Sequence, residues 1–131
     1  GWDWIGMNLD DGAALTAFRL RGVDGSTVYG GGSFRAAGGA VRNFAASEVL
    51  LTPGRHWTSP GSQARYPVEW SLDCPAGRFR VRSLLDAQEL DSRASTGSIY
   101  WEGLSELLDE AGRRVGLGYL EMTGYAARLS L

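Results

Sequence analysis

Apolar and polar residues alternate along two neighbouring stretches near the middle of the chain, residues 68–73 and 78–82. A period of two residues is typical of β-strands that bury one face and expose the other. The residues between the two stretches, Cys74-Pro75-Ala76-Gly77, have the composition of a turn. We therefore predict an antiparallel hairpin. Its buried face carries Val68, Trp70, Leu72, Phe79 and Val81.

Further strand-like stretches lie on both sides of this hairpin. The stretches Trp2–Leu9 and Ala14–Arg21 are separated by the turn Asp10-Asp11-Gly12 and form a second predicted hairpin. Shorter strands are predicted near residues 32–36, 40–44 and 48–51, and longer ones at residues 99–107 and 115–125. The chain is thus rich in short strands that are separated by turns.

The segment from residue 53 to residue 67 lacks this alternation. It contains three prolines, and proline at positions 60 and 67 disfavours central strand pairing because the residue has no N–H to donate. We predict a long irregular connection in which Trp57 packs against the rest of the protein.

Residues 100–112 admit two structures. Leu104, Leu107 and Leu108 have the spacing of one helix face, and glutamates are frequent around them. However, Asp109-Glu110-Ala111-Gly112 is a turn sequence, and the flanking stretches are rich in tyrosine and glycine. We therefore expect a hairpin here rather than a helix.

The composition favours an all-β fold of one domain. The chain has 131 residues, of which 44% are hydrophobic, with 19 glycines, five tryptophans, five tyrosines and four phenylalanines. Eight to ten short antiparallel strands favour a closed or nearly closed β-barrel, because closure removes exposed sheet edges.

Charge and composition exclude several functional classes. The 13 basic and 15 acidic residues give a net charge of −2, and the absence of a basic block argues against a nucleic-acid partner. No apolar stretch has the length of a membrane span. With one cysteine, Cys74, and one histidine, His56, we expect neither a disulfide framework nor a zinc site. No G-x-S-x-G motif accompanies His56, which we interpret as a loop residue.

Five motifs carry a resemblance to a known family. They are "WDWIGMNLDDGAALTAFRLR", "HWTSPGSQARYPVEW", "DAQEL", "YWEG" and "GLGYLEMTGY", in that order along residues 2–125. Together they resemble the C-terminal part of the carotenoid 1,2-hydratase (hydroxyneurosporene synthase) and AttH-like family. Members are often described as lipocalin-like or as secreted hydrolases.

This resemblance implies a lipocalin-like β-barrel of about 8–10 strands over residues 1–131. Members of the family usually carry two such barrels, with the ligand region in or between them, and this chain resembles the second barrel. The implied partners are a small hydrophobic ligand and a second barrel, supplied either by a missing N-terminal domain or by another copy of this chain. The family mixes functions, so the resemblance supports the fold more firmly than the reaction.

Hydration of a C=C bond, the reaction that the resemblance implies, begins with proton transfer to carbon. A carboxylic acid in an apolar environment is a suitable donor because desolvation raises its pKa. Aromatic faces then stabilise the carbocation, and water attacks it. This chemistry requires no metal or organic cofactor.

Glu102 and Glu121 are the candidate catalytic acids, because each lies among aromatic residues. Alternation places Glu102 with Tyr100 and Glu121 with Tyr119, so both acids enter the barrel only if those faces point inward. The alternatives are that both acids face outward, or that they enter and pair with arginines. The candidate ligand-binding residues are Trp4, Trp57, Tyr100, Trp101 and Tyr119.

Two other acids could also contribute. Asp3 lies between two tryptophans, where it could occupy the barrel rim or pair with an arginine. Gln88 and Glu89 follow a strand and could reach a cavity; equally, Glu89 could pair with Arg93 outside it.

Overall fold

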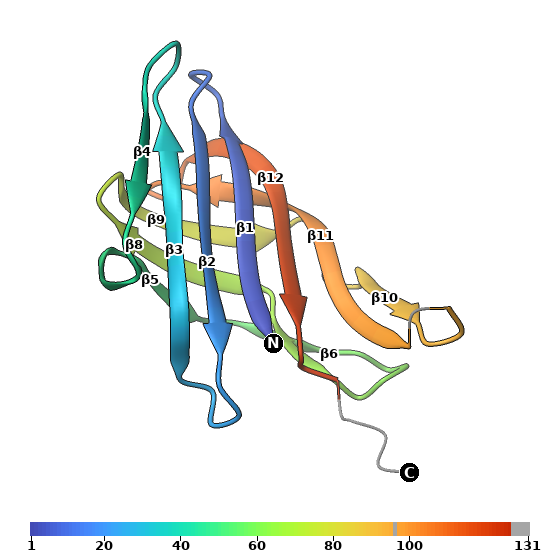
Figure 1. Ribbon diagram of the computed structural model, residues 1–131. Coiled ribbons are helices and arrows are strands. Elements are labelled where there is room, and N and C mark those ends of the chain that lie inside the picture. The colour runs from blue at the N-terminus through green and yellow to red at the C-terminus, as the bar shows by residue number, and fades with distance from the viewer. Residues whose placement is uncertain (96, 127–131) are drawn as a thin grey trace.

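The computed structural model describes residues 1–95 and 97–126, and it shows an antiparallel all-β chain (Figure 1). The strands are β1 (Trp2–Leu9), β2 (Ala14–Arg21), β3 (Thr27–Arg35), β4 (Val41–Phe44), β5 (Leu50–Pro53), β6 (His56–Thr58), β7 (Arg65–Pro67), β8 (Glu69–Cys74), β9 (Gly77–Ser83), β10 (Glu89–Ser92), β11 (Ser98–Leu108) and β12 (Arg114–Thr123). A single 3-10 turn, η1 (Ala46–Glu48), lies between β4 and β5. Within the described ranges, no helix is long and apolar enough to cross a membrane.

Ten of the strands form one sheet. Its order is β4-β3-β2-β1-β12-β11-β9-β8-β5, with β10 paired to β11, and β6 and β7 form a small second sheet. In Figure 1, β1 to β4 and β12 stand in front, while β5, β8 and β9 cross behind them. The predicted all-β antiparallel fold is confirmed, but closure into a barrel is not. The end strands β4 and β5 are not paired with each other in the part of the chain that the structure describes.

Three predicted hairpins are confirmed: β1–β2, β8–β9 and β11–β12. The ambiguous leucine-rich segment is strand, because β11 continues to Leu108. The following turn is fixed by Asp109, whose side chain accepts hydrogen bonds from the backbone N–H groups of Ala111 and Arg113, both at 2.9 Å. The turn chemistry, and not the helical spacing of the leucines, determines the local structure.

The proline-rich segment is more regular than the sequence predicts. It contains the short hairpin β6–β7, in which Trp57 lies opposite Tyr66 and His56 lies opposite Pro67. His56 is therefore a strand residue, which corrects its interpretation as a loop residue. Pro67 is tolerated because it ends a short strand, where no ladder hydrogen bond is lost.

The third strand also starts earlier than predicted, at Thr27 rather than near residue 32. Its three glycines lie inside the strand, where they allow it to approach β2 closely. A Cβ atom at Gly30 would come within 2.9 Å of the Phe18 carbonyl oxygen. Close backbone approach is a common reason for glycine within a strand.

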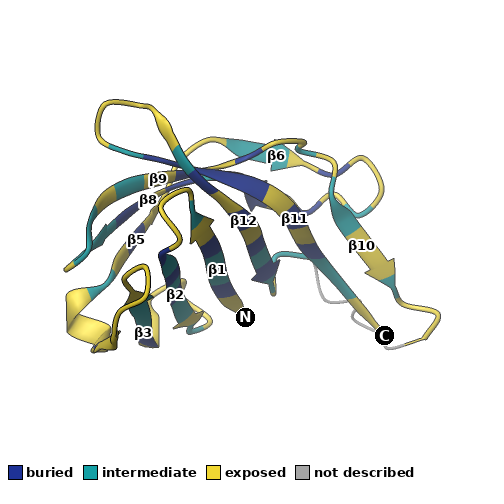
Figure 2. Cartoon of the chain, turned by 90° about the horizontal axis from the view of Figure 1, so that it is seen from above, coloured by how far each residue is buried: buried dark blue, intermediate teal, exposed yellow. Residues whose placement is uncertain are grey.

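The core lies between the front and rear strands. Along β1, β12 and β11, buried positions alternate with more exposed ones, as the bands in Figure 2 show. Trp70 and Trp101 are among the largest side chains that are fully buried. Other core residues are Ile5, Met7, Leu15, Ala17, Leu51, Leu72, Val81, Leu107, Leu120 and Met122. The concave side of the sheet is thus filled by the protein's own side chains around these positions.

Candidate functional site

Glu102 and Glu121 lie directly opposite each other on neighbouring strands, β11 and β12. Their sequence neighbours Trp101, Leu120 and Met122 are fully buried. Because successive side chains of a strand point to opposite faces, both glutamates lie on the outer face of the sheet. The structure therefore selects the outward alternative that the sequence left open.

Aromatic side chains surround this acid pair. Trp4 of β1 lies opposite Glu121 on the other side of β12, and its ring covers Gly6, where a Cβ atom would collide with it. Tyr119 lies two residues before Glu121 on β12, on the same face, and is 52% exposed. Tyr100 lies on the same face of β11 as Glu102, two residues away. Five of the seven predicted site residues thus share one outer surface: Trp4, Tyr100, Glu102, Tyr119 and Glu121.

The environment of Glu121 favours its protonated form. The pKa of the Glu121 carboxyl is raised above its ordinary value, mainly by partial burial and further by the negative charge of Glu102. A hydrogen bond from the Trp2 side chain opposes the shift. Because a neighbouring negative charge disfavours a second one, Glu121 retains its proton more readily than an isolated glutamate does.

The remaining predicted ligand residues lie elsewhere. Trp101 is fully buried, and its indole N–H donates to the Asp86 carbonyl oxygen at 2.7 Å. Trp57 lies on β6 and stacks on Tyr66, with ring centroids 6.3 Å apart. Neither side chain shares the outer surface of the acid pair, so the predicted residues do not form a single cluster.

Asp3 is held by cations, one of the alternatives that the sequence left open. Its carboxylate, 1% exposed, accepts hydrogen bonds from Arg19 Nε at 2.7 Å and from Arg21 Nη1 at 2.6 Å. The Tyr125 hydroxyl donates a third at 2.7 Å. The guanidinium of Arg21 also lies 4.0 Å from the centre of the Tyr125 ring. These charged and polar groups are paired with one another. The cluster therefore links β1 and β2 to Tyr125, which follows β12.

Glu89 forms a second polar cluster, which the sequence did not predict. It accepts hydrogen bonds from the hydroxyls of Ser59, Ser62 and Tyr66, each at 2.6 Å. Burial alone would raise the pKa of Glu89, but these three hydrogen bonds outweigh it and lower the pKa. Arg93, which the sequence left open as a partner of Glu89, instead pairs with Asp91 at 2.7 Å. The cluster attaches the β6–β7 hairpin to β10.

The histidine does not take part in either cluster. His56 is half-buried, and burial followed by the charge of Arg65 lowers its pKa. Both causes favour the neutral imidazole over the charged one.

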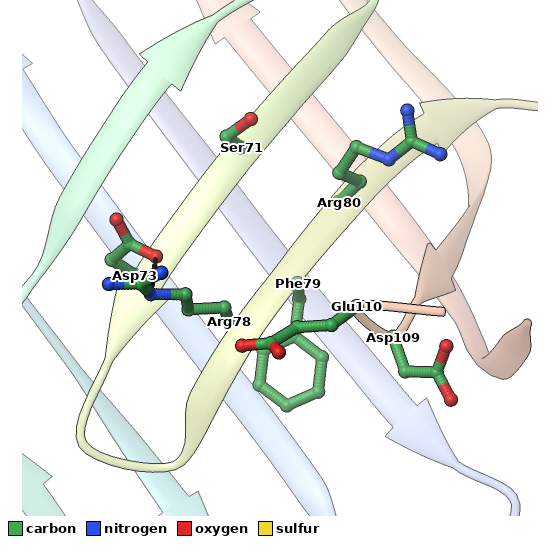
Figure 3. Close-up of a pocket in the computed structure, with 7 residues that line it drawn as sticks. All are labelled: Ser71, Asp73, Arg78, Phe79, Arg80, Asp109 and Glu110. Atoms are coloured by element: carbon green, nitrogen blue, oxygen red, sulfur yellow. Dashed lines mark ion pairs between the residues drawn. The ribbon is translucent and has the colours of Figure 1, made fainter. Parts of the chain in front are cut away.

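A pocket on the outer surface of the rear strands has a different character. Figure 3 shows that charged side chains from β8, β9 and the β11–β12 turn line it. Asp73 and Arg78 form an ion pair across it at 3.4 Å, and Phe79 points to the opposite side of β9 from Arg78. None of the predicted site residues lines this pocket, so we regard the outer surface of β1, β12 and β11 as the candidate site.

The chain is thus an antiparallel all-β protein whose outer sheet face carries aromatic and acidic side chains. The sequence matches the AttH-like family over residues 1–125, and the chain belongs to that family. This confirms the AttH-like part of the resemblance, whereas the carotenoid 1,2-hydratase assignment stays a prediction. Among curated proteins, none matches the chain.

Two solved structures are similar to the chain. One, described as an AttH candidate from Nitrosomonas europaea, is 44% identical over 96% of this chain, with a TM-score of 0.91. The other, kievitone hydratase from Nectria haematococca, is 18% identical over 95% of this chain with a TM-score of 0.71, and it supports the fold alone. The chain spans 39% of the length of each of these proteins.

Proposed function

We propose that this chain is the hydrophobic-ligand domain of an AttH-like protein, with the Glu102–Glu121 pair as its proton donor. The reaction is the cofactor-free addition of water to a C=C bond of an isoprenoid or carotenoid-like ligand. The observation that supports this most directly is the raised pKa of Glu121 beside Glu102, within an aromatic surface.

The chemistry balances with these residues alone. Protonated Glu121 gives its proton to one alkene carbon, and the π electron pair forms the new C–H bond. The adjacent carbon becomes a cation, which the faces of Trp4 and Tyr119 stabilise. Water adds to that carbon through an oxygen lone pair. The proton that the water loses returns to the carboxylate pair, so the net change is addition of one water molecule.

The outer surface suits this role better than the interior does. The concave side is packed with fully buried side chains such as Trp70, Trp101 and Tyr66. Trp2, Trp4 and Tyr119 instead offer accessible apolar area next to the acids. A ligand bound there still needs a cover, because open water lowers the pKa of a carboxyl.

A second candidate function is a non-catalytic binding or structural module that packs on a partner barrel. The breadth of the exposed apolar surface favours this second function. Exposed Tyr29 lies on β3, three strands away from Glu121, and exposed Leu20 lies on β2, two strands away. A small ligand alone does not need such a wide surface.

Tryptophan fluorescence quenching distinguishes these functions. The chain is titrated with carotenoids, shorter terpenoids and fatty acids across a pH series. We expect saturable quenching that weakens as the pH rises through the raised pKa of Glu121, because a charged carboxylate must be desolvated by the ligand. In Glu121→Gln, which mimics the neutral acid, we expect binding to persist without this pH dependence.

The matched control is Glu110→Gln, which removes an exposed acid from the β11–β12 turn. This variant should bind as the unmodified chain does at every pH. If no ligand quenches the fluorescence of folded protein, the non-catalytic module replaces the first proposal. The same conclusion follows if Glu121→Gln keeps the full pH dependence.

A further inference from the structure

Strand β11 lacks a neighbouring strand along part of one edge. On one side it pairs with β12 along most of its length. On the other side, β10 pairs with residues up to Trp101, and β9 pairs from Ser105 onward. Figure 1 shows β10 and β9 lying along different parts of β11. Within the described ranges, residues 102–104 therefore have no strand beside them on this edge, and Glu102, one of the two candidate acids, lies in the gap.

Gln88, which directly precedes β10, fills this gap. Its backbone carbonyl oxygen accepts a hydrogen bond from the Glu102 N–H at 3.3 Å. Its side-chain oxygen accepts one from the Leu104 N–H at 3.0 Å, and its side-chain nitrogen donates to the Leu104 carbonyl oxygen at 3.3 Å. The same nitrogen donates to the Leu85 carbonyl oxygen, and the Leu84 N–H also donates to that of Leu104. The Gln88 amide thus makes with Leu104 the pair of hydrogen bonds that a residue on a neighbouring antiparallel strand would make.

Gly103 provides the space that the Gln88 amide occupies. A Cβ atom at position 103 would lie 2.3 Å from Gln88 Cδ and 2.4 Å from its Nε2. Non-bonded heavy atoms prefer separations of about 3.5–4.0 Å, so a larger residue would displace the amide. The glycine that follows Glu102 therefore allows Gln88 to approach the strand closely.

Gln88 is itself held by a fixed group of partners. Its backbone N–H donates to the Asp86 carbonyl oxygen at 2.9 Å, and the Trp101 indole N–H donates to the same oxygen. The Asp86 carboxylate accepts two hydrogen bonds from Arg55, at 2.7 and 2.9 Å, and one from the Ser83 hydroxyl at 2.7 Å. A residue whose neighbours are fixed by their own hydrogen bonds can hold a further group in place.

The position of Glu102 affects Glu121, which lies directly opposite it on β12. The pKa of Glu121 is raised first by partial burial and then by the negative charge of Glu102. Movement of Glu102 away from β12 would weaken both causes, because repulsion falls with distance and because water would enter. Neither acid is held by an ion pair to a residue that the structure describes. The backbone hydrogen bonds of β11 are therefore what fixes Glu102.

We propose that Gln88 is a positioning residue for the acid pair: it completes the hydrogen bonds of β11 around Glu102 and so fixes that acid opposite Glu121. This inference rests on the proposed function, in which the two acids form the proton donor. Gln88 contacts neither carboxylate as a donor or acceptor; it acts through the backbone of β11. The sequence left open that Gln88 reaches a cavity, and the structure places it along the edge of a strand instead.

Carbon-13 NMR of the side-chain carboxyl groups tests this role in the variant Gln88→Ala. We expect the pKa of Glu121 to fall toward that of an ordinary glutamate, because Glu102 is no longer fixed beside it. Hydrogen exchange on the same sample should show the N–H groups of Glu102 and Leu104 exchanging several-fold faster. If this variant does not fold, Gln88→Met replaces it, since methionine has a similar length but cannot make these hydrogen bonds.

The matched control is Gln63→Ala. The Gln63 side chain also donates to a backbone carbonyl oxygen, that of Pro60 at 3.2 Å, but it lies in the turn between β6 and β7. This variant should change neither the titration of Glu121 nor the exchange of the Glu102 N–H.

Gly103→Ala gives an independent test that keeps Gln88 in the chain. The added methyl group takes the space of the amide and displaces it, so the pKa of Glu121 should fall as it does in Gln88→Ala. In the double variant the collision is absent. The fall should then equal that of Gln88→Ala alone and not the sum of the two single effects.

An unchanged titration of Glu121 in folded Gln88→Ala and in Gly103→Ala would overturn the proposal. Exchange that rises equally throughout the sheet would also overturn it, since Gln88 would then stabilise the fold as a whole. Failure of the proposed function gives a different result, because Glu121 would titrate as an ordinary glutamate in the unmodified chain. Exchange at Glu102 would still decide whether Gln88 fixes that residue.

Discussion

Replacement of Asp3 by asparagine is expected to lower the free energy of unfolding by about 3–5 kcal/mol. Asp3 is 1% exposed and accepts hydrogen bonds from Arg19, Arg21 and Tyr125. Asparagine has a similar shape but no charge, so the variant leaves two poorly exposed guanidinium groups without their anion. Their side chains are only 15% and 9% exposed, and water cannot replace the lost partner fully.

Urea denaturation measures this effect, with Asp91→Asn as the control. Asp91 pairs with Arg93 at 2.7 Å, but both side chains are about half exposed. An exposed ion pair contributes little to stability, so this variant should unfold at nearly the same urea concentration as the unmodified chain. Equal stability of the Asp3 and Asp91 variants would show that the buried cluster around Asp3 does not stabilise the fold.

Replacement of Trp101 by alanine is expected to cost about 3–5 kcal/mol of stability. The indole is fully buried in the core and donates its N–H to the Asp86 carbonyl oxygen. The variant loses buried area, creates a cavity and removes one of the two hydrogen bonds that the Asp86 carbonyl oxygen accepts; the other comes from the Gln88 backbone N–H at 2.9 Å. Trp101→Phe should lose less, because the phenyl ring keeps most of the packing.

Trp2→Ala is the matched control for this prediction, since Trp2 is 42% exposed on the outer surface of β1. Its removal should change the melting temperature little and ligand quenching strongly. If Trp101→Ala instead remains as stable as Trp2→Ala, position 101 does not have the packing role that its burial indicates.

Much of the strand arrangement was predictable because local rules determine it. Alternation gave β8 and β9, and turn residues such as Asp10-Asp11-Gly12 separated β1 from β2. The hairpin β6–β7 was missed because proline disfavours pairing in a central strand, whereas here Pro60 lies in the turn and Pro67 ends the short strand β7. Strand β10 was missed because only four residues pair, all of them with β11.

The orientation of the acid pair was not predictable from the sequence. Strands β1 and β12 carry large apolar residues on both faces: Ile5 and Leu120 point inward, while Trp4 and Tyr119 point outward. Alternation then identifies two faces without identifying the buried one. The Glu89 cluster was equally hidden, because its hydroxyl donors come from the β6–β7 hairpin, 23 to 30 residues away in sequence.

The titration of Glu121 tests the central claim most directly, namely that the outer acid pair retains a proton. Carbon-13 NMR of the side-chain carboxyl groups gives the apparent pKa values of the pair. We predict that Glu121 titrates above an ordinary glutamate, and that Glu102→Gln lowers this value by removing the neighbouring negative charge. Titration of Glu121 at or below the ordinary value, with no response to Glu102→Gln, would contradict the account.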